Sequence, residues 1–484
     1  MYTYQDLLDV GENDIARAKF CKQAVLQFMS TPEYASAKAG EAYYNKHNLT
    51  IEKFKRFLYT LSGKKVEDVF SANYKLKTTF FRRLTMQQIQ YVLGNGIILQ
   101  EEGNKEKLGD DFDFQVMTAA KRAMAAGRGF GFWNLDHLEV FGFADTPAQP
   151  GFCPLYSEKD SKLMAGIRYW FRQVNDKEVF RATLYEVDGF TEYRQSGNDE
   201  PEVMEEKQAY KQIIKRTEMD GVQEVIGENY TDLPIVCLYA NDSHESELEG
   251  MRECIDAYDL IKSGFCNNID DFDGFFWLVK NAGGMDDPDL AKFLMRLKTV
   301  HAASVEGDDG ATAEPHKAEV PTEARRTMLE LLRSDIYEDF QSVDVKTLSA
   351  AAKTTQEIQA AFQSMDNKCA DFEYYVLEFV KDILNIAGIK DNPTLNWNRM
   401  INQSEQTQMV LSASQYLTDE VVLKHLPFLT PEEVDGVIKQ RDMEDYDQFN
   451  AEDEEMDEEM SEEESSAQDE VLAMLDDLLA ELEG

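Results

Sequence analysis

Two long amphipathic segments, separated by a compact insertion, dominate residues 245–340 of this chain. In the first segment, apolar residues recur every three or four positions, at Leu248, Met251, Ile255, Tyr258, Ile261, Phe265 and Ile269. This spacing predicts one apolar stripe along a helix of about 25 residues, roughly 38 Å long at 1.5 Å per residue. The second segment, residues 321–341, predicts a similar helix that starts near Pro321. Two such helices cannot bury themselves alone, so they are expected to pack side by side with other helices.

The remaining segments predict an α+β fold that is mainly helical. Helices are expected over much of residues 1–93, over 112–127 and, as a third long helix, over 356–387. Residues 128–240 are rich in aromatic and β-branched residues and are interrupted by Gly, Asn, Asp and Pro, which is typical of a mostly antiparallel sheet. Shorter helices are predicted in residues 391–440.

The insertion between the two long helices predicts its own small structure. Residues 287–301 predict a short helix that starts near Asp287. Residues 302–321 predict two short strands around an acidic glycine turn. No internal repeat is evident. The length of 484 residues suggests two to four domains.

The net charge of −43 is unevenly distributed. Residues 442–484 hold 20 of the acidic residues and no Lys, Arg or His, which leaves a net charge of −23 on the rest. So acidic a chain is not an ordinary nucleic-acid binder, because such proteins recruit phosphates with Lys and Arg. Docking on an anionic membrane is also disfavoured. The acidic segment has too few apolar residues to fold alone, although residues 469–484 regain an amphipathic stripe.

The positions of the cysteines and the hydropathy of the sequence indicate the cellular compartment in which the chain is expected to fold. The six cysteines are widely scattered and form no Cys-x-x-Cys pair, which favours free thiols in a reducing compartment. The first twenty residues lack a basic start followed by an apolar run, so no signal peptide is predicted. No run of about 18 apolar residues predicts a membrane span.

No segment predicts a convincing active site, metal site or cofactor site. The glycines around Arg128 lack the Lys-Ser/Thr of a phosphate loop and are better explained as a helix end and a strand start. The six histidines show no metal-binding spacing. Asp270, Asp271 and Asp273 could bind a divalent cation, but an acidic helix end is favoured because no EF-hand pattern surrounds them. The sequence therefore favours an interaction or structural role over an enzyme.

The order of several segments resembles the portal proteins of tailed bacteriophages, in the subgroup of long-tailed phages of Gram-positive hosts. The segments that carry the likeness are residues 42–49 (AYYNKHNL), 87–96 (QQIQYVLGNG), 108–135, 233–284 and 317–345. Each is weakly specific, but together they span about residues 35–390 in one order. The resemblance implies a ring, usually of twelve subunits, around a channel for double-stranded DNA in the virion.

The resemblance also divides the chain into regions. It implies a wing at residues 1–244, stem helices at 245–272 and 321–341, a clip at 273–320, a tunnel loop at 342–354, a long wing helix at 355–390, a crown at 391–441 and an acidic tail at 442–484. It implies a location at the capsid portal vertex after assembly in the host cytoplasm. The implied partners are other copies of the chain, DNA in transit, the terminase, head-completion adaptors, and the capsid and scaffolding proteins, with no membrane.

Three residue sets follow from this division. The stem packing set is Leu248, Met251, Ile255, Tyr258, Ile261, Phe265, Leu329, Leu332, Ile336 and Phe340. The DNA-facing set in the tunnel loop is Val343, Lys346, Thr347, Ser349 and Lys353. The clip set, which would dock the motor and the adaptor, is Asp287, Lys292, Arg296, Lys298 and His301.

An acidic wall suits a DNA conduit, because each phosphate that Lys or Arg neutralises raises the barrier to sliding. The ATPase is expected in a separate terminase, since this chain lacks a Walker loop. Two other classes of protein would also use acidic segments of this chain. An acidic assembly chaperone would bind basic partners through the tail, and a metal-dependent nuclease would use the Asp270–Asp273 cluster.

Overall fold

The structure is a computed structural model that divides the chain into two compact units, Met1–Asn398 and Arg399–Gly484. In the first unit it describes residues 1–59, 64–69, 71–101, 103–146, 149–216, 223–270, 275–280, 288–289, 292–293, 295–296, 312–317, 322–344 and 355–398. In the second unit it describes residues 407, 410–426, 434 and 436–440.

Four helices open the first unit, and each begins after a capping side chain. They are α1 (Tyr4–Val10), α2 (Asp14–Met29), α3 (Pro32–Tyr44) and α4 (Leu49–Lys53). The side chains of Thr3, Asn13, Thr31 and Asn48 accept hydrogen bonds from the first free amides of these helices. A hairpin that the sequence did not predict follows, with strands β1 (Phe57–Tyr59) and β2 (Lys65–Glu67).

Two further helices lead into the sheet, and the second lies close to its predicted bounds of 112–127. They are α5 (Phe80–Leu93) and α6 (Phe112–Ala126), with the short 3₁₀ helix η1 (Glu106–Leu108) between them. Gly127 ends α6 with a φ of +81°. A side chain there would be strained by that φ, and its Cβ would lie 2.4 Å from the carbonyl oxygen of His244.

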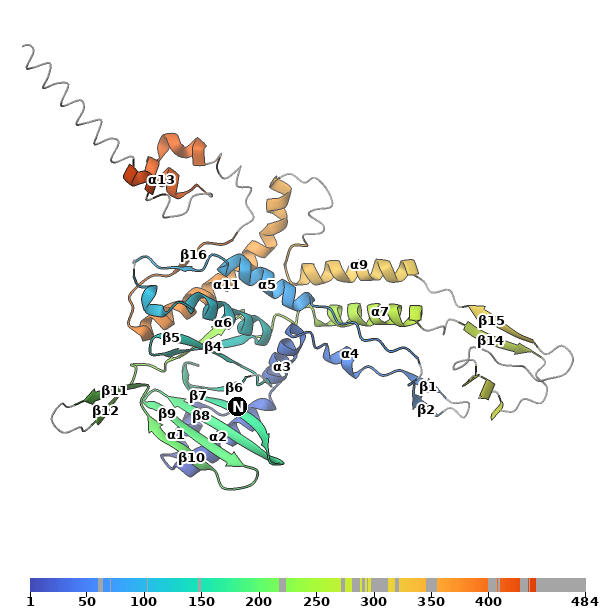
Figure 1. Cartoon of the computed structure of the whole chain (residues 1–484), viewed down its shortest axis with the longest axis horizontal. Helices are drawn as coiled ribbons and strands as arrows, with labels where there is room; N and C mark the ends of the chain where they lie inside the picture. The colour runs from blue at the N-terminus through green and yellow to red at the C-terminus, as the bar shows by residue number, and fades with distance from the viewer. Residues whose placement is uncertain are drawn as a thin grey trace, which may run out of the picture. The chain divides into compact units, whose positions relative to one another are not determined.

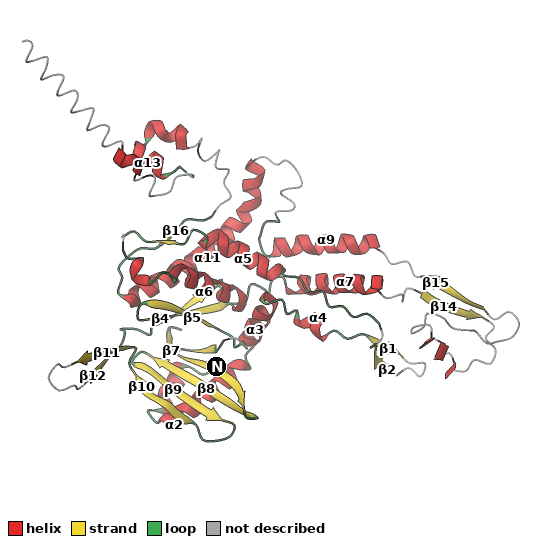
Figure 2. Ribbon diagram, viewed as in Figure 1, coloured by secondary structure: helices red, strands yellow, loops and turns green. Residues whose placement is uncertain are grey.

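An eight-stranded sheet forms the centre of this unit (Figures 1 and 2), and it confirms the predicted mostly antiparallel sheet. Its strands in spatial order are β10 (Glu202–Gln208), β9 (Gly189–Ser196), β8 (Lys177–Glu186), β7 (Leu163–Val174), β6 (Gly151–Tyr156), β5 (His137–Gly142), β4 (Arg128–Asn134) and β13 (Ile235–Tyr239). All pairs are antiparallel except β5 with β6. Asn175 and Asp176, both with positive φ, make the two-residue turn between β7 and β8.

Aromatic side chains fill the core between the sheet and its covering helices. Helix α2 contacts β6, β7, β8 and β10, whereas α6 and α11 (Thr355–Ala387) contact β4 and β13. The rings of Phe130 and Phe152 lie 4.5 Å apart, and both are fully buried. Gly166 on β7 makes room for this packing, because a Cβ there would meet the Phe152 ring at 2.0 Å.

Three small two-stranded sheets complete the first unit. They are β3 (Ile97–Ile98) with β16 (Thr394–Leu395), β11 (Lys211–Arg216) with β12 (Gln223–Glu228), and β14 (Phe275–Lys280) with β15 (Thr312–Lys317). The last pair confirms one strand within residues 302–321, while residues 302–311 and 318–321 lie outside the described residues. Strand β15 pairs with β14 at the far end of the insertion, and β14 was not predicted as a strand.

The two predicted long helices are present as α7 (Arg252–Asp270) and α9 (Thr322–Asp339). Helix α7 begins seven residues later than the stripe predicted, because residues 245–246 are irregular and residues 247–251 form turns. The third long helix, α11, matches its prediction closely. In the second unit, the described elements are η3 (Ser414–Tyr416) and α13 (Asp419–Lys424).

All six cysteines are free thiols, as predicted. Within the described residues, no helix is both long enough and apolar enough to cross a membrane.

Candidate functional site: the α7–α9 helix pair

Helices α7 and α9 lie side by side (Figures 1 and 2), and their apolar stripes are buried unevenly. At the ends nearest the sheet, six residues of the stem packing set are buried, namely Leu248, Met251, Ile255, Leu332, Ile336 and Phe340. All but Leu332 share one cluster with side chains of α3, α5 and α6. This half of each stripe is therefore completed inside the chain.

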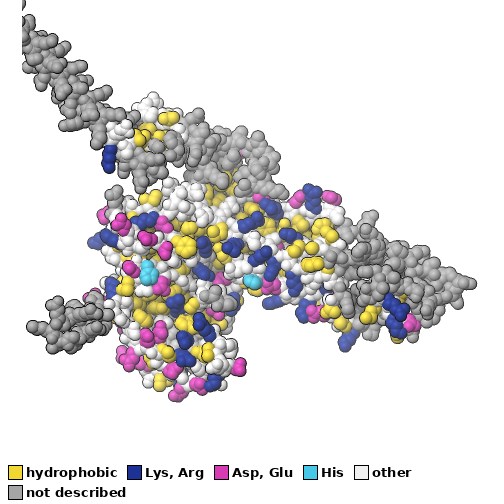
Figure 3. Space-filling view, in the orientation of Figure 1, with side chains coloured by type: hydrophobic (Ala, Val, Ile, Leu, Met, Phe, Trp, Pro, Cys, Tyr) yellow, Lys and Arg dark blue, Asp and Glu magenta, His cyan; other side chains and the backbone are white. Residues whose placement is uncertain are grey.

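Farther along the pair, the apolar side chains are only partly covered. Tyr258, Ile261, Phe265 and Leu329 of the stem packing set are half-buried. Leu260, Met328 and Leu331 are 43%, 43% and 54% exposed. The space-filling view shows apolar side chains along the pair amid interspersed acidic and basic groups (Figure 3). The predicted need for outside partners thus applies to this outer half.

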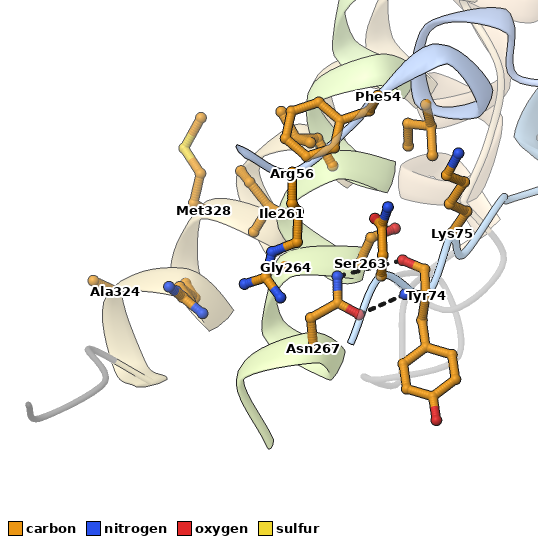
Figure 4. Close-up of a pocket in the computed structure, with 14 residues that line it drawn as sticks. Phe54, Arg56, Tyr74, Lys75, Ile261, Ser263, Gly264, Asn267, Ala324 and Met328 are labelled. Carbon is orange, nitrogen blue, oxygen red and sulfur yellow. Dashed lines mark hydrogen bonds between the residues drawn. The ribbon is translucent and has the colours of Figure 1, made fainter. Parts of the chain in front are cut away.

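A ladder of polar side chains on α7 holds a neighbouring segment, Tyr74–Thr78, by its backbone. Asp259 accepts a hydrogen bond from the Thr78 amide at 3.0 Å, and Ser263 accepts one from the Leu76 amide at 2.9 Å. Asn267 accepts from the Tyr74 amide at 2.7 Å and donates to the Tyr74 carbonyl (Figure 4). Successive side chains of the ladder are four residues apart on α7, a rise of about 6 Å, and their partners are two residues apart in an extended segment, a span of about 6.6 Å. The two spacings therefore match.

The ladder continues toward the N-terminus of α7 with two carboxylates. Asp256 accepts hydrogen bonds from the hydroxyls of Tyr43 and Thr50, at 2.5 and 2.6 Å. Asp259 also accepts one from the Asn48 amide at 3.0 Å. Burial raises the pKa of Asp259, and the hydrogen bonds from Thr78 and Asn48 partly oppose that rise. One side of α7 is therefore fixed to the N-terminal region of its own chain.

A second group of contacts fixes the point where the predicted tunnel loop leaves α9. Arg333 makes a bidentate pair with Asp344, at 2.8 and 2.9 Å. Gln87 of α5 donates to the Val343 carbonyl at 3.2 Å. The Val343 side chain is buried in the main core, so it faces the protein interior and not a channel. Lys346, Thr347, Ser349 and Lys353 lie outside the described residues.

Lys368 joins α11 to the segments at the base of both α7 and α9. Its ammonium donates to the Phe340 carbonyl at 3.0 Å and lies 2.5 Å from Glu247 Oε2. It also lies 3.7 Å from the centre of the Phe340 ring, within cation–π range. Both charged side chains are largely buried, with 17% and 11% exposed. The base of the helix pair is therefore tied to α11 by charge.

A cavity of about 500 Å³ opens between α7, α9 and the segments on either side of the β1–β2 hairpin (Figure 4). Its apolar walls include Phe54, Leu260 and Met328. Arg56, Lys75 and Arg325 also line it. No acidic residue is among the described residues that line the cavity.

The clip set is only partly visible. Lys292 and Arg296 are exposed on short helical stretches, and Lys292 lies 3.3 Å from Asp289. Asp287, Lys298 and His301 lie outside the described residues. The clip set therefore stays a prediction, with only Lys292 and Arg296 among the described residues.

The described residues gather no cluster of three His, Cys, Asp or Glu side chains that could hold a metal ion. Asp270 ends α7, while Asp271 and Asp273 lie outside the described part of the chain. Burial raises the pKa of the Cys21 and Cys153 thiols, which opposes nucleophilic reactivity.

Sequence reasoning missed the residues that hold the helix pair in place. Asp256, Asp259, Ser263 and Asn267 follow helical spacing, but such polar residues are ordinarily assigned to a solvated face. Lys368 and Arg333 gave no signal, since each partner lies in another segment of the chain. The helical spacing of the four polar residues was the one available signal.

Comparison with known proteins identifies the class of molecule that this fold represents. The chain belongs to the family described as phage portal protein, SPP1 Gp6-like, whose family profile matches residues 31–467. It is 20% identical over 417 residues to the portal protein of Clostridium phage phiCD119, covering 81% of this chain and 89% of the relative. It is 22% identical over 434 residues to the portal protein of Bacillus phage SPP1, covering 84% and 83%.

These comparisons confirm the resemblance drawn from the sequence, including the phages of Gram-positive hosts. They support a phage portal, or head-to-tail connector, role and fit a structural protein of the virion better than an enzyme.

Proposed function

We propose that this chain assembles into a ring-shaped channel at one capsid vertex, through which double-stranded DNA is packaged and later ejected. One observation carries the proposal beyond family membership. The α7–α9 pair is anchored to its own chain at the base, yet leaves Leu260, Met328 and Leu331 substantially exposed along its outer half. Exposed apolar side chains in a row on paired helices are expected to be covered by neighbouring copies.

The proposed regions follow the order of the chain. The wing comprises residues 1–244 and 355–390, the stem 245–272 and 321–341, the clip 273–320, the tunnel loop 342–354 and the crown 391–441. In this assignment α7 and α9 are the part of the channel wall that one subunit contributes. The β14–β15 pair belongs to the clip, which would dock the terminase and later the head-completion adaptors.

The charge of the chain supports passage of DNA without tight binding. A net charge of −43 on each subunit disfavours a fixed complex with phosphates, and weak binding lets a duplex slide. Lys346 and Lys353 are the only basic residues in the proposed tunnel loop. We expect them to contact phosphates transiently. If changing both to alanine left packaging and DNA retention untouched, this part of the proposal would be wrong.

Electron microscopy of negatively stained, purified protein tests the ring directly. The proposal predicts closed rings, with about twelve subunits and a central hole of about duplex width. A chain that stays monomeric at every concentration would contradict it and favour the acidic chaperone. Mg²⁺-dependent cleavage of DNA by the purified chain would favour the nuclease instead.

A further inference from the structure

The cavity beside the helix pair differs in charge from the chain around it. The whole sequence has 92 acidic and 49 basic residues. The described lining of the cavity contains Arg56, Lys75 and Arg325 and no carboxylate. A cationic hollow in so acidic a protein calls for a specific explanation.

Two of these cations are held by neutral oxygens. Lys75 donates to the backbone carbonyl of Glu52 at 2.7 Å. In the amide orientation that satisfies both groups, Arg325 donates to the Asn268 side-chain oxygen at 2.7 and 2.9 Å. Among the described residues, no carboxylate lies within ion-pair distance of either cation, so both positive charges remain available to an anionic group.

The same cavity also exposes apolar surface. Phe54, Leu260 and Met328 line it and are 47%, 43% and 43% exposed. The cavity therefore combines an apolar wall with positive charge, as at interfaces with an apolar centre and a charged rim. Its complement would carry an apolar side chain beside a carboxylate.

We infer that a neighbouring copy of this chain fills the cavity and places a carboxylate against Arg325 and Lys75. This inference rests on the proposed ring and names the attractive contact within it. Subunits of charge −43 repel one another, so a contact between a positive hollow and an acidic surface would offset that repulsion and fix the register of neighbours.

The geometry favours a second copy over DNA as the occupant. A hollow of about 500 Å³ admits a few side chains but not a duplex, and phosphates would gain nothing from apolar walls. Both stem helices line the cavity, so it continues the exposed row that the proposed ring must cover. The surface of another copy supplies both carboxylates and exposed apolar side chains.

Adjacent arginines on α9 allow a matched test. Arg325 lines the cavity, whereas the neighbouring Arg326 does not line it, pairs with Glu330 at 3.2 Å and has a 73% exposed side chain. Assembly of the full-length chain is measured by mass photometry over a concentration series at low and at high salt. Arg325→Glu is expected to raise the concentration for half-assembly by about tenfold or more, and Arg326→Glu to leave it nearly unchanged.

A second pair of variants tests shape without changing charge. Ala324→Trp would place a bulky ring in the cavity, while Thr327→Trp adds the same ring at an exposed position that does not line it. We expect the first variant to impair assembly and the second to assemble normally. Circular dichroism confirms that each variant is folded.

The outcomes separate the inference from the function on which it rests. If the wild-type chain never forms rings, the proposed function fails and this inference fails with it. If the wild type forms rings and Arg325→Glu and Ala324→Trp assemble equally well, only the inference is overturned. It is also overturned if Arg325→Glu abolishes binding of a labelled DNA duplex while assembly stays intact.

Discussion

The sheet core and the α7–α9 pair bury their apolar side chains in opposite ways. In the sheet core, aromatic residues such as Phe130, Phe152 and Tyr169 are fully buried within the same chain. In the helix pair, enclosure is complete only near the base, and Leu260 and Met328 remain 43% exposed. The difference indicates that the sheet core supplies monomer stability, whereas the outer half of the helix pair is available for assembly.

Substitution in the sheet core should cause the largest loss of monomer stability. Phe152→Ala is expected to lower the free energy of unfolding by about 3–5 kcal/mol, because it leaves a cavity against Phe130 and Phe141. Urea unfolding followed by circular dichroism measures the loss. Phe114→Ala, at a position that is 59% exposed, should change stability little. Equal losses for both would contradict the proposed role of this core.

Glu41 on α3 should make stability depend on pH. Burial raises the pKa of this carboxyl from 4.5 to about 7, even though Arg122 lies 3.8 Å away and opposes the rise. Between pH 4.5 and 7 the folded chain keeps a proton that the unfolded chain releases. Stability should therefore fall by up to about 3 kcal/mol as pH rises through this window, and the Glu41 contribution should level off above it.

Glu41→Gln isolates this effect from the other carboxyl groups. The variant should lose that part of the pH dependence, so its stability relative to the wild type should rise between pH 5 and pH 8. Glu33→Gln, on the exposed side of the same helix, provides the control. Parallel pH profiles for the wild type and Glu41→Gln would show that Glu41 does not titrate in this range.

Lys368, at the junction between the sheet core and the helix pair, should contribute a smaller amount to the free energy of unfolding. Lys368→Met is expected to cost about 2 kcal/mol, because Glu247 would keep a largely buried charge without its partner. Adding Glu247→Gln should recover much of that loss, and a double-mutant cycle in urea measures the coupling. Additive losses would mean that the two charges do not interact.

Substitution of the exposed apolar residues on the helix pair should have the smallest effect on monomer stability. Leu331→Gln is expected to change the free energy of unfolding by less than about 0.5 kcal/mol, since Leu331 is 54% exposed. The same change should weaken assembly in sedimentation experiments. Ile15→Gln on α2, at a residue that is 46% exposed, should affect neither property. A large stability loss at Leu331 would erase the contrast between the two regions.

The sequence predicted the regular elements well, because apolar periodicity directly reports which side of a helix or strand is buried. Helix α11 and the antiparallel sheet followed their patterns closely. The start of α7 was misplaced because Leu248 and Met251 obey helical spacing although they lie in turns. Ser246 donates a hydrogen bond to the Ala125 carbonyl at 2.7 Å and fixes those turns, a long-range contact that periodicity does not report.

The candidate site was harder to predict than the fold. Six residues of the stem packing set are buried near the base of the helix pair, and Val343 of the tunnel set is buried in the core. The polar ladder of α7 was missed, since Asp259 and Asn267 resemble solvated residues until the segment Tyr74–Thr78 is placed beside them. The strand Phe275–Lys280 has the aromatic and β-branched composition of a strand and could have been predicted from it.

Hydrogen exchange on assembled and dissociated protein tests the central claim most directly. If α7 and α9 form the wall of a ring, amides of their outer halves should exchange more slowly after assembly, while amides of strands β7 and β8 should be unchanged. Protection confined to the sheet, with none gained along Leu260–Asp270 or Thr322–Leu331, would contradict the assignment of the helix pair as the channel wall.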